Sequence, residues 1–143
     1  EFNDYTAFIF TSTNSIKNLN LENIDKTIKC FCVGTSTEKF ARKVGFQNVI
    51  SSDGNVRALK ELILQNHDKK DGKLLYISGE FISYNLDKDI LKEGYDISRL
   101  INYSVDHNDE IKAEIIEELK KNIPDIVYIY SENSAKSFLN IVI

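Results

Sequence analysis

Small hydroxyl and glycine residues follow three apolar runs, and they are the residues best placed to do chemistry. The three corners are Thr11 with Ser12, the segment 34–37, and Ser78 with Gly79. If each run is a buried parallel strand, these corners lie at one edge of a sheet, where ligands of open α/β sheets bind. Backbone N–H groups at helix starts bind anions there. We therefore expect ligand-binding residues among them: Thr11, Ser12, Gly34, Thr37, Ser78 and Gly79. Helix capping and tight turns are the simpler interpretation of any single corner.

The first corner occurs a second time near the other end of the chain. Residues 8–15 read FIFTSTNS and residues 127–134 read VYIYSENS, so Ser12 aligns with Ser131 and Asn14 with Asn133. Each copy is typical of a buried strand that ends in a turn and caps the next helix. The repeat suggests two related lobes facing one site, and it adds Ser131 and Asn133 to the expected binding residues.

Tyr103 is the candidate catalytic residue. It ends the fifth apolar segment, where a polar hinge begins. A phenol at this place could donate a proton or a hydrogen bond to a leaving group. The alternative is an aromatic that packs between domains with its polar tip exposed.

Several familiar catalytic motifs are missing from the sequence. The segment 34–37 lacks the second glycine and the lysine of a phosphate-binding loop, and there is no glycine-rich dinucleotide fingerprint. A receiver domain would need acidic residues where Thr11 and Ser12 stand. We expect His67 and His107 to be solvated, and neither is placed to serve as the base for a serine nucleophile. Standard hydrolase and kinase chemistry is disfavoured.

The two cysteines, Cys30 and Cys32, are one residue apart in an apolar run. On a strand both side chains point to the same face, and we expect buried free thiols. No His or Cys spacing supports the alternative, a metal site. Free thiols favour a reducing, cytoplasmic compartment.

Composition narrows the class of protein further. The 143 residues are 42% hydrophobic, which suffices for a core, and the formal net charge is −4. Basic residues are scattered among acidic ones, which argues against a nucleic-acid surface. No apolar run reaches the roughly 20 residues of a membrane span, and no signal-peptide pattern opens the chain. Because the first residue is Glu1 rather than Met, we expect either a processed chain or a piece of a longer one.

Strand-like and helix-like segments alternate along residues 1–103. Strands are predicted at 5–11, 27–33, 47–50, 73–77 and 95–103, and helices at 14–20, 35–44, 56–66 and 82–91. Such alternation indicates an α/β fold with a parallel five-stranded sheet flanked by helices.

The character of the sequence changes after Tyr103. A polar hinge leads to an amphipathic helix at 110–122, a strand at 125–130 and a helix from Asn133 onward. We expect residues 1–103 to form a complete α/β lobe and residues 104–143 to form the hinge and a partial second lobe.

The ordered set of motifs resembles the uroporphyrinogen-III synthase family. The matching residues are FIFTSTNS at 8–15, CVGTST at 32–37 with Gly45 and Phe46 downstream, LLYISG at 74–79, Tyr103, and the segment 125–134. The resemblance implies two α/β lobes joined by linkers, with the active site between them. It also implies a cofactor-free reaction: closure of the linear tetrapyrrole hydroxymethylbilane, with inversion of the last pyrrole ring and loss of water, on the route to haem.

The resemblance also assigns roles. Thr11, Ser12 and Thr37 fall on substrate-binding positions, Tyr103 on the tyrosine that assists loss of the hydroxyl, and Ser131 on the serine of the other lobe. The substrate is a polyanion, but the chain itself is acidic. We therefore expect backbone N–H groups rather than a basic pocket to bind it. We expect a monomer when the protein is full length. Thr13 and Glu132 stand where the family often has proline. The alternative function is a non-catalytic α/β module that binds a small anion or a protein.

Overall fold

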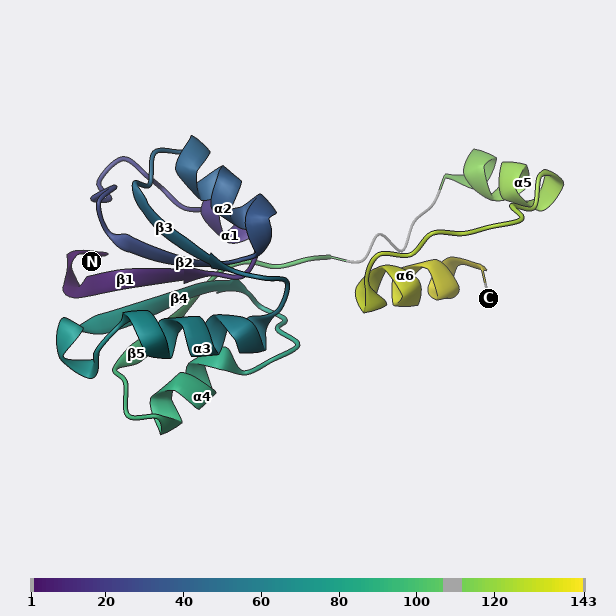
Figure 1. Ribbon diagram of the computed structural model, residues 1–143. Helices are drawn as coiled ribbons and strands as arrows, with labels where there is room; N and C mark the ends of the chain where they lie inside the picture. Colours follow the sequence, from purple (N-terminus) through teal and green to yellow (C-terminus); the bar gives the residue numbers. More distant parts are fainter. Residues whose placement is uncertain (1, 107–111, 143) are drawn as a thin grey trace. The chain divides into compact units, whose positions relative to one another are not determined.

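Five parallel strands form the centre of the first of two compact units, Glu1–Val105 and Asp106–Ile143. The computed structural model describes residues 2–106 and 112–142 (Figure 1). The strands lie in the order β3-β2-β1-β4-β5, and every neighbouring pair is parallel. Their bounds are β1 Tyr5–Phe10, β2 Lys29–Val33, β3 Asn48–Ser52, β4 Lys73–Gly79 and β5 Ile97–Tyr103. The predicted fold class, a parallel five-stranded sheet flanked by helices, is confirmed.

Helices cover both faces of this sheet (Figure 1). One face carries α1 (Thr13–Lys17) and α2 (Gly34–Lys43), and the other carries α3 (Val56–Asn66) and α4 (Leu86–Lys92). Two short 3₁₀ turns, η1 (Phe2–Asp4) and η2 (Lys69–Asp71), precede β1 and β4. Helices on both faces explain why the central strands are apolar along their whole length instead of alternating between apolar and polar residues.

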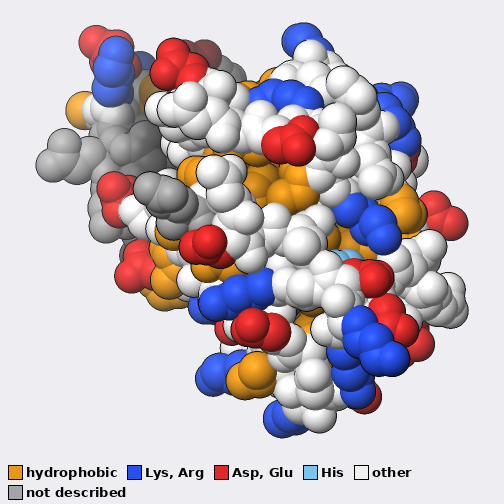
Figure 2. All heavy atoms as spheres, turned by 90° about the vertical axis from the view of Figure 1, so that its left-hand side faces the viewer, with side chains coloured by type: hydrophobic (Ala, Val, Ile, Leu, Met, Phe, Trp, Pro, Cys, Tyr) orange, Lys and Arg blue, Asp and Glu red, His pale blue; other side chains and the backbone are white. Residues whose placement is uncertain are grey.

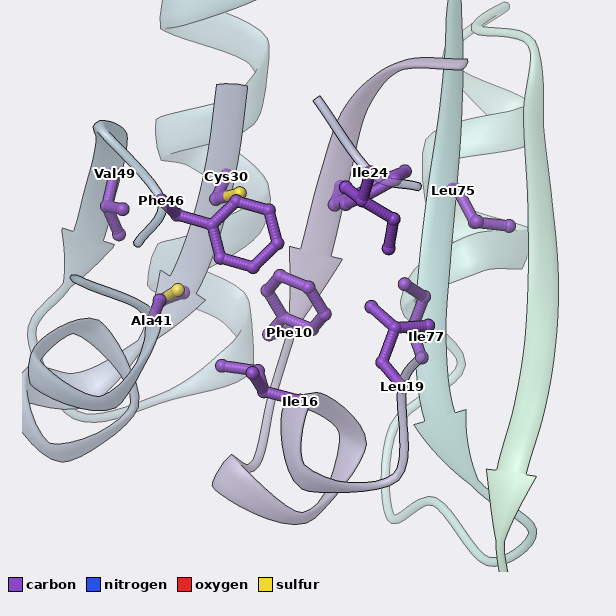
Figure 3. Close-up of a cluster of buried hydrophobic side chains, with 12 residues drawn as sticks. Phe10, Ile16, Leu19, Ile24, Cys30, Ala41, Phe46, Val49, Leu75 and Ile77 are labelled. Atoms are coloured by element: carbon purple, nitrogen blue, oxygen red, sulfur yellow. The ribbon is translucent and has the colours of Figure 1, made fainter. Parts of the chain in front are cut away.

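Alternating strand residues build a separate core on each face. Phe8 and Phe10 of β1 join the core beneath α1 and α2, while Ala7 and Ile9 of the same strand join the core beneath α3 and α4. Figure 3 shows the first of these cores, in which Phe10 and Phe46 lie with ring centroids 5.9 Å apart. Fully burying a side chain of this size is worth about 1.5–3 kcal/mol, so the β1 residues are major contributors to the stability of the unit.

Local signals set most helix boundaries. The Asn55 side chain accepts a hydrogen bond from the Ala58 N–H at 2.8 Å and caps α3. Gly45 follows α2 with φ +107°, a conformation that a residue with a Cβ rarely adopts. The predicted helix 82–91 is shorter than expected, because α4 begins only at Leu86. Tyr84 donates a hydrogen bond to the Asp89 carboxylate, which holds the preceding segment as a loop.

His67 is buried, so the prediction that it is solvated is wrong. Only 3% of the residue is exposed, and its Nε2 lies 3.1 Å from the Gly72 carbonyl oxygen. The ring also makes an edge contact with Phe31. The polar neighbours of His67 in sequence suggested exposure, but the chain folds back through η2 and covers the ring. His107 lies outside the described residues.

The second unit contains α5 (Ala113–Lys121) and α6 (Glu132–Val142). The strand predicted at 125–130 is wrong: this segment forms no strand, and Ile126 and Tyr130 are 68% and 92% exposed. A strand requires a neighbouring strand for its backbone hydrogen bonds. The described residues of this unit supply no such neighbour. Of the predicted helix 110–122, residues 110 and 111 lie outside the described part.

Cys30 and Cys32 are fully buried free thiols, as the sequence indicates. Burial raises the pKa of the Cys30 thiol well above its ordinary value of 9.0. Burial likewise raises the pKa of Cys32 to about 12. Both thiols therefore stay protonated in the folded protein at alkaline pH.

These thiols should make the first unit less stable as the pH rises above 9. In the unfolded chain the thiols ionise, whereas in the folded chain they do not. The free energy of unfolding should then fall by about 1.4 kcal/mol per pH unit for each thiol between pH 9 and the raised pKa values. Urea unfolding between pH 8 and 9.5, where unfolded tyrosines with their ordinary pKa of 10.0 stay mostly protonated, measures this slope. The Cys30→Ala, Cys32→Ala double variant should show a nearly flat profile, and an unchanged slope in that variant would contradict the prediction.

Candidate functional site

The strand order creates a switch point between β1 and β4. From β1 the chain runs outward to β2 and β3, and then returns to β4 and β5 on the other side. Helices on the two sides of such a point diverge, which leaves room for a ligand beyond the carboxyl ends of the strands. Thr11 and Ser12 follow β1, and Ser78 and Gly79 end β4. The structure therefore places these predicted residues on the two sides of the switch point.

At the end of β1, Thr11 is linked to a buried phenol. Its Oγ1 lies 3.2 Å from the Tyr76 hydroxyl, and Tyr76 is only 1% exposed. Burial raises the pKa of Tyr76, and the hydrogen bond with Thr11 partly opposes that effect. The Tyr76 phenol is therefore neutral at physiological pH. Sequence reasoning missed Tyr76, because a tyrosine inside an apolar run is indistinguishable from a core residue.

Ser12 caps α1. Its Oγ accepts a hydrogen bond from the Asn14 N–H at 3.2 Å, and its carbonyl oxygen accepts one from the Ser15 hydroxyl at 2.6 Å. These contacts match the simpler interpretation of this corner, helix capping.

At the end of β2, Gly34 opens α2. It has φ +75°, and a Cβ there would meet no atom within 4 Å, so the surrounding space is open. Val33 is the N-cap residue and makes no side-chain capping bond, while Thr35 and Ser36 are exposed. Thr37 is only 5% exposed and lies against the core. The first N–H groups of α2 are thus the available donors at this corner.

At the ends of β4 and β5, the ring of Tyr103 rests on Gly79. A Cβ at Gly79 would lie 2.7 Å from Tyr103 Cε2 and 3.1 Å from its hydroxyl oxygen, so a larger residue there would push the ring aside. The Glu80 N–H donates to the Tyr103 carbonyl oxygen at 2.9 Å. Pairing between the strands shifts register here, with Ser78 opposite Ile101 and Gly79 opposite Tyr103. This irregularity sets where the phenol lies.

Arg99 of β5 lies beside the same corner and was not among the predicted residues. Its Nε donates to Ser78 Oγ and its Nη2 to the Gly79 carbonyl oxygen, both at 2.8 Å. Asn102 also connects β5 to the site region, since its Nδ2 donates to the Ser15 carbonyl oxygen at 2.7 Å. Arg99 and Asn102 are polar residues inside a strand that is otherwise largely apolar. This pattern could have identified both from the sequence.

Ser131 and Asn133 belong to the second unit, where they open α6. The Ser131 Oγ accepts a hydrogen bond from the Ser134 N–H at 3.1 Å, which is a helix cap like that of Ser12. Both residues are exposed. Their role in binding stays a prediction.

The edge of the sheet opposite the site is electrically mixed. Figure 2 shows the side of the molecule at the left of Figure 1, where the amino ends of the strands lie and where acidic and basic side chains surround a shallow apolar hollow. A polar hollow of about 610 Å³ around His67 and Tyr95 lies at the amino ends of the strands, away from Tyr103. Among the described residues, no three His, Cys, Asp or Glu side chains gather as metal ligands would. No helix within 2–106 or 112–142 has the length and apolar character that crossing a membrane requires.

Gly79→Ala should displace Tyr103. The added methyl group would overlap the ring, and overpacking of this kind costs about 1–3 kcal/mol. Urea unfolding of the single variant and of the same substitution combined with Tyr103→Ala measures the effect. Removing the ring should abolish most of the cost, because the clash disappears. Gly54→Ala is the matched control: a Cβ there meets nothing within 4 Å, so its cost should not depend on Tyr103. Equal costs of Gly79→Ala in both backgrounds would exclude the contact.

Comparisons with known proteins support one family. The family model described as uroporphyrinogen-III synthase HemD matches residues 1–143. The crystal structure of uroporphyrinogen-III synthetase from Helicobacter pylori 26695 is similar, with a TM-score of 0.72 and 21% sequence identity. That similarity covers 99% of this chain and 64% of the Helicobacter chain, so this chain spans less than two thirds of its length. At this identity the likeness establishes the fold. No curated protein matches the sequence significantly.

Proposed function

The chain belongs to the uroporphyrinogen-III synthase family, and from that premise we propose that its parent protein closes hydroxymethylbilane to uroporphyrinogen III. The reaction inverts the last pyrrole ring and releases water, in tetrapyrrole and haem biosynthesis. The observation that carries the proposal is the placement of Tyr103, held against Gly79 beside the switch point of the sheet. The parent protein would act without a cofactor, in the cytoplasm, as a monomer.

Tyr103 would assist the departure of the substrate hydroxyl. Its phenol would donate a proton or hydrogen bond to the leaving oxygen while the carbon–oxygen bond breaks, and water would leave. Tyr103 is partly exposed. Because its ring is supported by Gly79, the phenol needs little reorganisation before it acts.

Backbone donors would bind the carboxylates of the substrate. The chain has a net charge of −4, which disfavours a strongly basic pocket as the binding device. The start of α2 offers N–H groups that no side chain caps, next to Gly34, which leaves open space. These groups and the partial positive charge of a helix N-terminus suit a carboxylate. The predicted contacts of Thr11, Ser12, Ser78 and Gly79 would complete the binding edge.

We propose that the second unit begins the other lobe and that Ser131 and Asn133 act from there. Two lobes joined by linkers can bring the ends of a long, flexible substrate together. Much of the catalytic effect would then come from proximity and orientation, which can lower a barrier by roughly 7–11 kcal/mol.

A non-catalytic module that binds a small anion or a protein is the second candidate. It is favoured by the way the structure uses the predicted hydroxyl groups. Thr37 and Ser78 are buried, and Ser12 caps a helix. In a module of this kind Tyr103 would only pack against Gly79.

The product formed from hydroxymethylbilane distinguishes the two functions. The full protein that carries this chain should yield mainly the type III isomer, whereas spontaneous closure yields type I. Separation of the isomers by chromatography after oxidation to the porphyrins provides the measurement. Formation of type I alone, at the rate of the uncatalysed reaction, would contradict the enzymatic function.

Tyr103→Phe should lower kcat by about 100-fold while KM changes little, because the phenol acts at the transition state of water loss. Tyr5→Phe is the matched control, since Tyr5 opens β1 at the opposite end of the sheet. It should retain the rate of the unmodified protein. Initial rates of type III formation measure both variants. A full rate in Tyr103→Phe would assign Tyr103 to packing.

A further inference from the structure

Among the described residues, the guanidinium of Arg99 donates its hydrogen bonds to one short segment, residues 78–80. It donates from Nε to Ser78 Oγ at 2.8 Å, and from Nη2 to the Gly79 and Glu80 carbonyl oxygens at 2.8 and 3.0 Å. None of the ion pairs among the described residues includes Arg99. Arg99 holds a backbone segment instead.

The same segment contacts Tyr103. Gly79 lies directly under the phenol ring, and the Glu80 N–H donates to the Tyr103 carbonyl oxygen at 2.9 Å. Ser78 also donates from its hydroxyl to the Gly79 carbonyl oxygen at 3.0 Å. Residues 78–80 therefore accept hydrogen bonds from Arg99 and also contact Tyr103. A shift of this segment moves the surface on which the ring rests.

The register irregularity explains why such support is needed. The strand pairing passes from Ser78 opposite Ile101 to Gly79 opposite Tyr103, so one residue of β5, Asn102, has no paired residue on β4. A bulge of this kind interrupts the regular hydrogen bonds between strands. The planar fork of an arginine can bridge several acceptors in a fixed geometry, which a single ammonium group cannot do.

We propose that Arg99 is a positioning residue for the reaction: it fixes the backbone of residues 78–80 and thereby orients the Tyr103 phenol toward the leaving group. This inference rests on the proposed function and adds a residue to it. Arg99 itself does not donate the proton. Its contribution to the rate passes through Tyr103 alone.

The kinetic test combines Arg99→Gln with Tyr103→Phe in the full protein that carries this chain. Arg99→Gln should lower kcat about tenfold and change KM less than about twofold, since misplacement of a catalytic group reduces turnover. In the Tyr103→Phe background the same substitution should lower kcat by less than about twofold, because the group it orients is already absent. Equal effects of Arg99→Gln in both backgrounds would overturn the inference.

Two further variants separate positioning from charge and from stability. Arg99→Lys keeps the positive charge but not the fork, so its kcat should fall nearly as far as that of Arg99→Gln. A normal rate in Arg99→Lys would overturn the inference. Arg42→Gln is the matched control, because Arg42 donates to the Val49 carbonyl oxygen at 2.7 Å on the far side of the sheet. Its kcat should stay unchanged even where its unfolding midpoint falls.

A structural readout separates failure of this inference from failure of the proposed function. Nuclear Overhauser contacts between the Gly79 α-protons and the Tyr103 ring should be strong in the unmodified protein and weak or absent in Arg99→Gln and Arg99→Lys. Retained contacts would overturn the inference while leaving the enzymatic function intact. Only type I product from the unmodified protein would overturn both. If Arg99→Gln does not fold, Ser78→Ala removes one acceptor more gently, and it should reduce kcat and the contacts together.

Discussion

Burial of the parallel sheet on both faces is the constraint on which the rest of the first unit depends. Each central strand must supply apolar side chains to both cores, as Phe8 and Ile9 do from adjacent positions of β1. Helices then have to cross over between parallel strands, and every strand carries the chain to the same edge. The polar corners gather at that edge for this reason. Their placement follows from the packing before any ligand is considered.

The candidate site is built largely from backbone and from neutral side chains. Gly34 leaves open space at the start of α2, and Gly79 leaves room for the ring of Tyr103. The phenol of Tyr76 is linked to Thr11 by a hydrogen bond. Under the proposed function, oriented donors with little net charge would bind the polyanionic substrate. The hydroxyl groups serve capping and internal hydrogen bonds, which keep the edge rigid. Rigidity of this kind favours catalysis by orientation.

The second unit shows that a strand-like sequence does not form a strand without a neighbouring strand to pair with. Residues 125–130 have the β-branched and aromatic residues of a strand, yet they leave Ile126 and Tyr130 largely exposed. Helix α6 forms beside them because its hydrogen bonds are internal and Ser131 caps it. Strand formation depends on a partner, whereas helix formation depends mainly on the local sequence. The repeated motif therefore preserves its helical half in both copies and its strand in only one.

The sequence by itself determined most elements of the first unit, their parallel pairing and the polar corners that end the strands, because these follow from periodicity, capping residues and glycine. It also indicated the buried thiols and Tyr103. The order of the strands came only from the structure. Only the tertiary structure decided which polar groups meet. Arg99 reaches residues 78–80 and Thr11 reaches Tyr76 across strand pairs far apart in sequence. The same long-range packing buried His67. Within the described residues of the second unit, no strand pairs with 125–130. Local patterns specify a residue's own backbone, but contacts between distant segments depend on register and on the presence of a partner.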